Sequence, residues 1–310
     1  MQKIKYSFVL PAYKARFFRE ALDSILAQTY KDFELIIVND ASPEDLDSIV
    51  KSYDDPRIRY YVNEHNIGGK DLVAQWNHCL EYAEGDYIIL ASDDDVYFPQ
   101  YLEKMDALVQ KYPEVNVFRP RIQHIDENGN IKCVYGCIAE KVSPLEYWYF
   151  WGIVGSSIGH IVFNRGELCN RGGFVNFPMG WGADDATILM MGNNGICFVS
   201  EILFSFRMSG ENISSALNDY QTLTKKIIAH NIFYNWLKAY IEQVPTKKQL
   251  DGFWRYAAIQ NIDNLFQAFT LGQVDNASLY SMLKVLPRLL RLEYTSFMTI
   301  FKRVVIRIIR

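Results

Sequence analysis

The feature that most constrains the fold is an apolar run that ends in three consecutive acids. Residues Ile88–Ala91 are all apolar, and Asp93, Asp94 and Asp95 follow after a single serine. A short apolar run of this kind is typical of a strand that is covered on both faces of its sheet. Adjacent carboxylates repel one another, so a folded chain that keeps them together usually places a cation among them. A divalent ion that carries phosphates is the first interpretation, and a solvated acidic turn is the alternative.

Strand and helix patterns alternate through the first half of the chain. Strands are expected at Tyr6–Pro11, Phe33–Val38, 58–62 and 86–91, and later at 115–118, 155–164 and 196–207. Between the early strands, apolar residues recur at helical spacing, which predicts an α/β fold with a mostly parallel sheet flanked by helices. After about residue 215 the pattern is helical only, so we expect one domain over residues 1–215 and a helical C-terminal region over residues 216–310.

Polar residues follow several of the expected strands, at the edge where α/β sheets bind ligands. They are Asp40, Lys70 in the turn Asn66–Lys70, the acids Asp93–Asp95, and the pair Asp184–Asp185. A carboxylate at Asp40 can accept a hydrogen bond from a nucleotide base, or it can be an acid at a helix N-terminus. Lys70 can meet a phosphate, although a plain turn explains it equally well.

The two acidic groups point to different chemistry. The oxygens of Asp93–Asp95 suit Mg²⁺ or Mn²⁺, which proteins often hold with one or two carboxylates and the phosphates of a substrate. One carboxylate of Asp184–Asp185 can act as a general base toward a hydroxyl, and capping of the helix that follows is the alternative.

Composition excludes several classes of protein. The net charge of −4 argues against general binding of nucleic acid. The five cysteines include no CxxC pair and no zinc-like cluster, so reduced thiols are expected. The N-terminus has no signal-peptide pattern, and no apolar stretch is long enough to cross a bilayer. We therefore expect a cytoplasmic protein.

A series of motifs from Ser7 to about Ser215 resembles the family 2 glycosyltransferases of the GT-A fold. The motifs are Ser7–Tyr13, Ser24–Tyr30, Phe33–Ser42, Asn77 with 83–88, the acidic cluster with Pro99, Asp184–Asp185, and Phe206–Arg207 with Asn212–Ser214. The order and spacing of these motifs carry the resemblance. Ser92 and Ser209 stand where many family members have an acid and a histidine, respectively.

The resemblance implies an inverting transfer of a sugar from a nucleoside diphosphate donor, with a UDP-sugar favoured. The acceptor would be a hydroxyl of a glycan or of a lipid-linked saccharide, as in the synthesis of cell-surface polysaccharide. By position, the donor would be bound by Pro11, Tyr13, Asp40, Lys70, Asp93 and Asp184. Asp94 and Asp95 would hold Mn²⁺ or Mg²⁺ in a DXD-type motif, and Asp185 would be the catalytic base.

The C-terminal residues mix apolar and basic side chains. Pro287–Arg310 has the pattern of a basic amphipathic helix that can lie in an anionic membrane interface. The alternative is a helix packed on the rest of the protein with solvated arginines. The helical region would thus supply acceptor, membrane or oligomer contacts, and peripheral attachment would place the protein at the inner face of the membrane.

Two other functions fit parts of the pattern. A sugar nucleotidyltransferase also binds nucleotides on such a sheet, but it needs a glycine-rich phosphate loop after the first strand, and Tyr13–Arg16 contains no glycine. A catalytically degenerate module that only binds nucleotide sugar is the non-enzymatic alternative. The presence of Asp94 and Asp185 argues against it.

Overall fold

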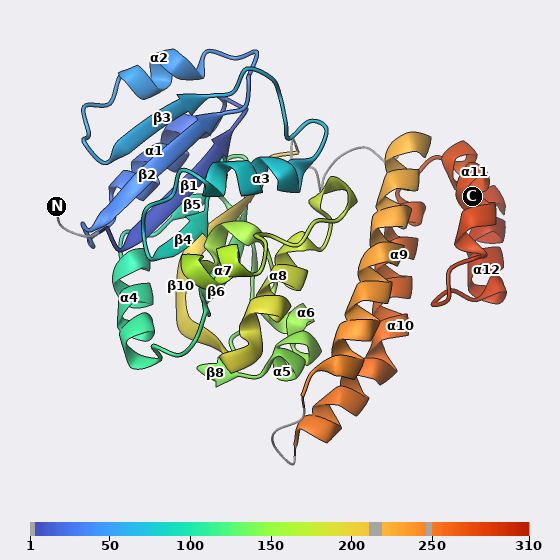
Figure 1. Cartoon of the computed structure of the whole chain (residues 1–310). Helices are drawn as coiled ribbons and strands as arrows, with labels where there is room; N and C mark the ends of the chain where they lie inside the picture. Colours follow the sequence, from blue (N-terminus) through green and yellow to red (C-terminus); the bar gives the residue numbers. More distant parts are fainter. Residues whose placement is uncertain (1–3, 211–218, 246–249, 310) are drawn as a thin grey trace. The chain divides into compact units, whose positions relative to one another are not determined.

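The computed structural model describes residues 4–210, 219–245 and 250–309. The motif residues Asn212–Ser214 therefore lie outside the described residues. The chain divides into two compact units, one formed by residues 1–176 and 183–209 and the other by residues 177–182 and 210–310 (Figure 1).

The first unit is built on a sheet with the strand order β3-β2-β1-β4-β9-β6-β10-β5, to which β7 and β8 are added at β6 and β10. The strands are β1 Tyr6–Ala12, β2 Phe33–Asn39, β3 Ile58–Val62, β4 Tyr87–Leu90, β5 Val96–Tyr97, β6 Val117–Asp126, β7 Ile131–Val134, β8 Lys141–Val142, β9 Val162–Asn164 and β10 Ile196–Met208. β1 is parallel to both β2 and β4, and β3 is parallel to β2. β9 runs antiparallel between β4 and β6. The predicted α/β fold with a central sheet is confirmed, and the sheet adds antiparallel pairs at β9, β7, β8 and β5 to the parallel ones.

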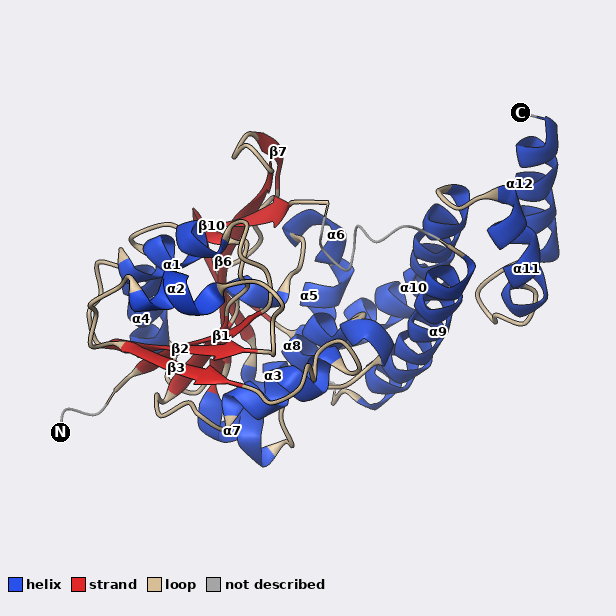
Figure 2. Ribbon diagram, turned by 90° about the horizontal axis from the view of Figure 1, so that it is seen from above, coloured by secondary structure: helices blue, strands red, loops and turns tan. Residues whose placement is uncertain are grey.

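Helices cover both faces of this sheet. They are α1 Phe18–Leu26, α2 Leu46–Lys51, α3 Leu72–Leu80, α4 Tyr101–Lys111, α5 Pro144–Tyr149, α6 Trp151–Val154, α7 Arg165–Asn170 and α8 Ala183–Met191. Figure 2 shows α1, α2 and α4 on one face and α3 and α7 on the other. Every residue of β2 is buried, as its nearly continuous apolar sequence predicts for a strand covered on both sides.

One expected strand is much shorter than the sequence indicates. Only Val162–Asn164 of the predicted strand 155–164 is extended, and Ile158–His160 forms a 3-10 helix instead. Gly155 has a φ of +62°, a left-handed conformation that ends α6 and that favours glycine. The segment before β9 therefore turns back along the acidic loop: a Cβ atom on Gly159 would lie 3.2 Å from Asp95 Oδ2.

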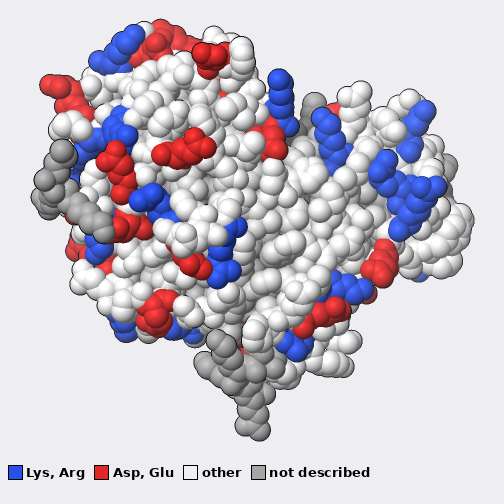
Figure 3. Space-filling model, viewed as in Figure 1, with Lys and Arg blue, Asp and Glu red and all other residues white. Residues whose placement is uncertain are grey.

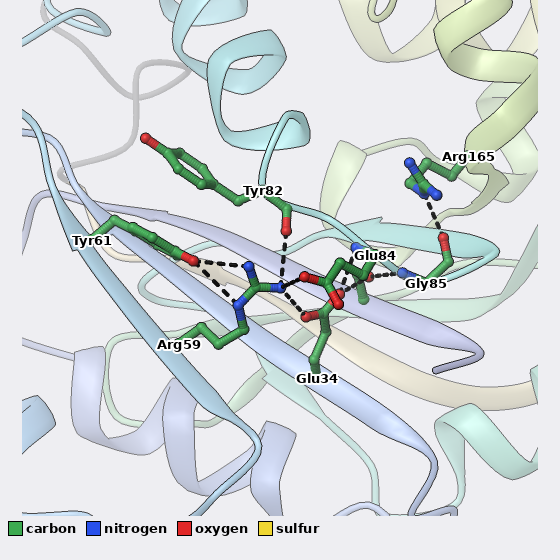
Figure 4. Close-up of polar contacts among 8 residues, drawn as sticks. Glu34, Arg59, Tyr61, Tyr82, Glu84, Gly85 and Arg165 are labelled. Carbon is green, nitrogen blue, oxygen red and sulfur yellow. Dashed lines mark hydrogen bonds and ion pairs between the residues drawn. The ribbon is translucent and has the colours of Figure 1, made fainter. Parts of the chain in front are cut away.

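A polar cluster around the buried Glu34 ties together the amino-terminal ends of the parallel strands (Figure 4). Glu34 Oε1 accepts hydrogen bonds from Ser7 Oγ at 2.6 Å and from the Glu84 N–H at 2.7 Å. Glu34 Oε2 pairs with Arg59 Nη1 at 2.7 Å, and the same nitrogen lies 2.9 Å from Glu84 Oε1. The Gly85 N–H donates to Ser7 Oγ at 2.8 Å. This cluster fixes β1, β2, β3 and the turn before β4 as one block.

The second unit is helical in the part that the structure describes. Its helices are α9 Tyr220–Gln243, α10 Asp251–Asp275, α11 Leu279–Leu289 and α12 Phe297–Ile309, with a short 3-10 helix at Pro178–Gly180. Figure 1 shows α9 and α10 side by side, and buried polar side chains join them: His230 Nδ1 lies 3.0 Å from Thr270 Oγ1. Within the described ranges, no helix has the length and apolar character that spanning a membrane requires.

Candidate active site

The acidic loop after β4 is anchored to the loop after β1. β1 and β4 are parallel neighbours, so their carboxyl ends lie at the same edge of the sheet. Asp93 Oδ2 accepts the backbone N–H groups of Tyr13 at 2.9 Å and Lys14 at 2.8 Å. Burial raises the pKa of Asp93, and these two hydrogen bonds oppose the rise. Asp93 thereby fixes the backbone at Tyr13, another predicted site residue.

Asp94 lies in the centre of the acidic loop. Its Oδ2 accepts a hydrogen bond from Ser209 Oγ at 3.2 Å, and Ser209 directly follows β10. Burial, followed by the charge of Asp93, raises the pKa of Asp94 to about 6. A carboxylate whose charge is this unfavourable gains from a cation in its vicinity. The structure thus places Ser209, 115 residues further along the chain, on the carboxylate predicted to bind metal.

Asp95 faces the interior of the protein. It is 1% exposed, and its Oδ1 accepts the Arg207 N–H at 2.9 Å. Asp95 Oδ2 has no hydrogen-bond partner in the part of the chain that the structure describes, and Gly159 lies close to it. Arg207 Nε also donates to the Asp94 carbonyl oxygen at 2.9 Å, so the loop is held against β10. The role of Asp95 as a metal ligand stays a prediction.

Asp40 and the turn Asn66–Lys70, two separate predicted features, are in direct contact. Asp40 Oδ1 accepts the Ile67 N–H at 2.9 Å, and Oδ2 accepts the Gly68 N–H at 2.7 Å. Asn63 Nδ2 donates to Oδ1 as well, at 2.8 Å. Asp40 is 5% exposed and therefore acts as an anchor for this turn, whatever else it binds, while the Lys70 side chain is exposed.

The loops after β1 and β2 are also joined. The Asp40 N–H donates to the Ala12 carbonyl at 3.0 Å, and Ser42 Oγ donates to the Tyr13 carbonyl at 2.6 Å. The Tyr13 residue itself is 40% exposed, and Pro11 is half-buried at the end of β1. The loops after β1, β2 and β4 therefore form one connected edge, and an exposed aromatic ring lies on it.

The second acid pair opens α8 in a buried setting. Asp185 Oδ1 accepts hydrogen bonds from Tyr147 OH at 3.2 Å and from Trp151 Nε1 at 2.8 Å. Asp184 Oδ2 accepts one from Ser156 Oγ at 3.4 Å. Burial, followed by the charge of Asp184, raises the pKa of Asp185 to about 8. A carboxyl group with such a pKa can exchange a proton near neutral pH, which is what a general base requires.

Sequence reasoning missed the buried arginine behind this pair. Arg119 belongs to β6 and is 0% exposed, and its Nη1 donates to Tyr147 OH at 3.2 Å. The available signal was a single cation in the apolar stretch Val117–Pro120. Tyr147 belongs to an aromatic run at residues 147–151, in which Tyr147 and Trp148 are buried and Tyr149 is 41% exposed.

Besides Asp40 with its turn and Pro11, the predicted site residues fall into two groups on the first unit. One group joins Tyr13, Asp93, Asp94 and Asp95 with Ser209, and the other joins Asp184 and Asp185 with aromatic donors. Among the described residues, no set of three or more His, Cys, Asp or Glu side chains forms a complete metal site. The hard oxygens of Asp94, with a raised pKa, nevertheless fit Mg²⁺ or Mn²⁺ shared with phosphates.

Comparisons of sequence give matches in the N-terminal part of the chain. Residues 7–151 match the model of the family described as "Glycosyl transferase family 2". The chain is 38% identical over 129 residues to "Putative glycosyltransferase EpsE" of Bacillus subtilis, which is 40% of this chain and 45% of the relative. It is 34% identical over 155 residues to "Uncharacterized glycosyltransferase MJ1057" of Methanocaldococcus jannaschii, which is 48% of this chain and 52% of the relative. The matches span about half the length of these relatives.

Comparisons of structure extend over more of the chain at lower identity. S. aureus TarS 1-349 in complex with UDP-GlcNAc has a TM-score of 0.57 and 19% identity, with 87% of this chain and 92% of TarS covered. The mannosyltransferase PcManGT from Pyrobaculum calidifontis, in complex with GDP-Man and Mn²⁺, has a TM-score of 0.55 and 14% identity, with 98% and 86% covered. At such identities the likeness concerns the fold, and the predicted GT-A fold is confirmed.

Proposed function

We propose, from the premise that the chain belongs through residues 7–151 to glycosyl transferase family 2, that it transfers a sugar from a nucleoside diphosphate to an acceptor hydroxyl with inversion. The observation that carries this proposal is the buried Asp185 carboxylate, which has two donors on one oxygen and a pKa near 8. Relatives of the same fold that bind UDP-GlcNAc, UDP and GDP-Man support a nucleotide-sugar donor.

In the proposed reaction, Asp185 acts on the acceptor. Its carboxylate takes the proton of the acceptor hydroxyl while the hydroxyl oxygen forms a bond to the anomeric carbon. The bond from that carbon to the diphosphate oxygen breaks on the opposite face, and its electron pair leaves with the diphosphate. Asp184, directly beside the base, raises the proton affinity of Asp185 by its charge.

The acidic loop would bind the diphosphate side of the donor. Asp94 and Asp95 are the residues proposed to hold Mn²⁺ or Mg²⁺, which when bound neutralises negative charge on the diphosphate. Asp93 keeps the backbone of Tyr13 and Lys14 in place beside this loop. Lys70, exposed at the start of α3, is available for a phosphate. Asp184 and Pro11 stay in the proposed donor site by their positions in the motifs.

We favour UDP as the nucleotide because the anchored Asp40 carboxylate suits the N–H of uracil, although thymine offers the same group. A thermal-shift screen of UDP-, dTDP- and GDP-sugars with Mn²⁺ or Mg²⁺ tests this choice, since a ligand that binds the native state raises its melting temperature. We expect UDP-sugars to give the largest rise, and the rise to depend on metal. A larger rise with GDP-sugars would overturn the choice of nucleotide.

Release of nucleoside diphosphate distinguishes the proposed activity from its two alternatives. A transferase releases UDP from a UDP-sugar when an acceptor is supplied, and often slowly to water without one. A sugar nucleotidyltransferase would instead release pyrophosphate from a nucleoside triphosphate and a sugar phosphate. Binding of donor with no release of UDP in the presence of glycan or lipid-linked acceptors would favour a binding module.

Two helices of the second unit present apolar side chains beside cations. On α11, Tyr280, Leu283 and Leu290 are 65%, 45% and 45% exposed, and with the exposed Pro287 they form a stripe at helical spacing. The exposed cations next to this stripe are Lys284, Arg288 and Arg291. Neither α11 nor α12 contains an acid, and Figure 3 shows the blue side chains over these helices among uncharged atoms.

On α12, Phe297, Met298 and Phe301 are more than half exposed, and the Phe297 and Phe301 rings stack at 5.8 Å. Exposed apolar stripes with flanking cations are the features of helices that lie in an anionic lipid interface. We therefore propose peripheral attachment to anionic lipid, at the inner face of the membrane. A second copy of this chain is the less favourable occupant, because two copies would bring cations against cations. This location would suit a lipid-linked saccharide acceptor of the kind used for cell-surface polysaccharide.

Sedimentation with vesicles tests the lipid surface. The full chain is expected to sediment with vesicles that contain phosphatidylglycerol and to stay in solution with pure phosphatidylcholine. The variant Lys284→Glu/Arg288→Glu/Arg291→Glu should bind more than about tenfold more weakly, since each cation near an anionic surface contributes about 1 kcal/mol. The matched control Lys51→Glu/Lys132→Glu/Lys225→Glu carries the same charge change elsewhere and should bind like the wild type. Equal binding by both triple variants, or dimerisation that the α11 changes abolish, would contradict the proposal.

A further inference from the structure

The guanidinium of Arg119 is linked to the Asp185 carboxylate through one tyrosine. Arg119 Nη1 donates to the Tyr147 hydroxyl oxygen at 3.2 Å. The Tyr147 hydroxyl in turn donates to Asp185 Oδ1 at 3.2 Å. Residues from β6, α5 and α8 therefore form a continuous chain of donors that ends on the carboxylate, and each of the three side chains is buried.

Arg119 also holds the second donor to Asp185. Its Nη2 donates to the carbonyl oxygens of Val154 at 2.9 Å and Gly155 at 2.7 Å, which are the last carbonyls of α6. α6 begins with Trp151, whose Nε1 donates to the same Asp185 Oδ1. One buried guanidinium thus fixes both elements that present hydrogen-bond donors to this oxygen.

The environment of Arg119 is unusual for a residue with a purely structural role. A buried cation is strongly destabilising unless a nearby anion compensates it. The Arg119 guanidinium lies over the Tyr147 and Phe198 rings, and within the described residues its Nε has no hydrogen-bond partner and no ion pair with a carboxylate is found. The anions that act on its charge are Asp185 and Asp184, beyond the Tyr147 ring. The arrangement therefore costs stability and directs positive potential toward the acid pair.

We propose that Arg119, acting through Tyr147 and Trp151, is a positioning residue that orients the Asp185 carboxylate and stabilises it as an anion. The proposal rests on the base role assigned to Asp185 above. It assigns no contact with substrate to Arg119 itself.

The charged and titratable groups around Asp185 determine the direction of the expected effects. Burial, followed by Asp184 on the same helix, raises the pKa of Asp185, while Ser156, Trp151 and Tyr147 lower it by donating to the charged form. The positive charge of Arg119, which belongs to β6, favours the charged form of Asp185. His160, which faces Arg119, adds no cation, because burial first and Arg119 next keep its pKa well below the ordinary value. Loss of a donor should therefore raise the pKa of Asp185 further.

The test is a titration of the Asp185 carboxyl group by carbon-13 NMR in the full chain, with the signal assigned by its loss in Asp185→Asn. In Tyr147→Phe, which keeps the ring, we expect the titration to move up by about one to two pH units, since a hydrogen bond to a charged group contributes roughly 1.5–3 kcal/mol. Trp151→Phe and Arg119→Met should move it in the same direction. Tyr149→Phe, the same change on an exposed residue of α5, is the matched control and should leave the midpoint unchanged.

Activity provides the second readout. The acid limb of kcat/KM should move to higher pH in Tyr147→Phe by the same amount as the carboxyl titration, which a loss of stability alone would not produce. An unchanged titration midpoint of Asp185 in a folded Tyr147→Phe protein overturns the proposed action of Arg119 through Tyr147. This test holds even if Arg119→Met fails to fold. A moved titration together with full transfer by Asp185→Asn would keep the coupling but overturn the base role, so the two failures are distinguishable.

Discussion

At the amino-terminal edge of the sheet, Glu34 is buried and accepts hydrogen bonds from Ser7 and Glu84 together with an ion pair from Arg59. At the carboxyl-terminal edge, Asp94 is buried as well. Burial and the charge of Asp93 raise its pKa, and the charge of Lys14, a 3.2 Å hydrogen bond from Ser209 and the charge of Arg207 only partly oppose the rise. The first carboxylate has its cation built into the fold, and the second has a pKa raised to about 6.

This difference separates a site of stability from a site of function. A buried carboxylate that is fully hydrogen-bonded and paired holds strands together and has no capacity left for a ligand. Acids that are buried next to one another, with raised pKa values, gain from an external cation or proton and are typical of functional sites. The comparison predicts that a substitution at the amino-terminal edge lowers the stability of the protein, whereas a substitution at the carboxyl-terminal edge lowers its activity.

The largest effect is expected from Asp185→Asn. An amide cannot take the proton of the acceptor hydroxyl, so transfer should fall by about 10²–10⁴-fold, the usual contribution of a general base. Binding of the donor, measured by calorimetry, should not change because the substitution keeps the shape of the side chain. Turnover near the wild-type value would remove Asp185 from the base role.

Asp94→Asn should have the next largest effect. Loss of the carboxylate weakens the metal ion's hold on the diphosphate, and several kcal/mol of charge stabilisation correspond to a loss of about 10²–10³-fold in turnover. Titration of activity with Mn²⁺ should show that more metal is needed for half-maximal rate. Asp54→Asn, on an exposed loop of the same unit, is the matched control. Unchanged metal dependence in Asp94→Asn would place the metal elsewhere.

Glu34→Ala, at the amino-terminal edge, should reduce the stability of the protein and leave its turnover unchanged. The change leaves the Ser7 hydroxyl, the Glu84 N–H and the Arg59 guanidinium without their acceptor, which should lower the free energy of unfolding by about 3 kcal/mol. Urea denaturation measures this loss. Glu64→Ala, which changes an exposed glutamate, is the matched control and should lower the free energy of unfolding very little. Activity per folded molecule should stay at the wild-type value, and a selective loss of turnover would show that the edges are coupled.

The last prediction concerns the pH dependence of stability. The native pKa values of Asp94 (about 6) and Asp185 (about 8) lie above the ordinary value of about 3.9. Between these limits the native state keeps protons that the unfolded chain has released, so these groups lower the stability as pH rises from about 4 to about 8. Asp94→Asn/Asp185→Asn should lose this part of the slope in urea denaturation series. A wild-type protein that gains stability over that window relative to the variant would contradict the raised values.

Local pattern was sufficient for much of the fold and for part of the site. The apolar run Leu35–Val38 in β2 and the acids directly after β4 are properties of neighbouring residues, so they are visible in the sequence. The short strand β9 is the exception, because the backbone conformation at Gly155 and the packing of Gly159 against Asp95 interrupt an otherwise apolar segment. The motif pattern gave Asp94 and Asp185 as candidates, and their roles stay proposals.

By itself, the sequence determined the alternating α/β order, the placement of acids after the strands, and the match of residues 7–151 to a family model. Only the tertiary structure decided that Asp40 anchors the turn at Gly68, that Ser209 contacts Asp94, and that Arg119 supports Asp185 through Tyr147. The physical reason is how far apart in sequence the interacting residues are. Periodicity reports which residues a helix or strand buries, whereas a hydrogen bond between residues far apart in sequence depends on strand order and packing, which no local pattern encodes.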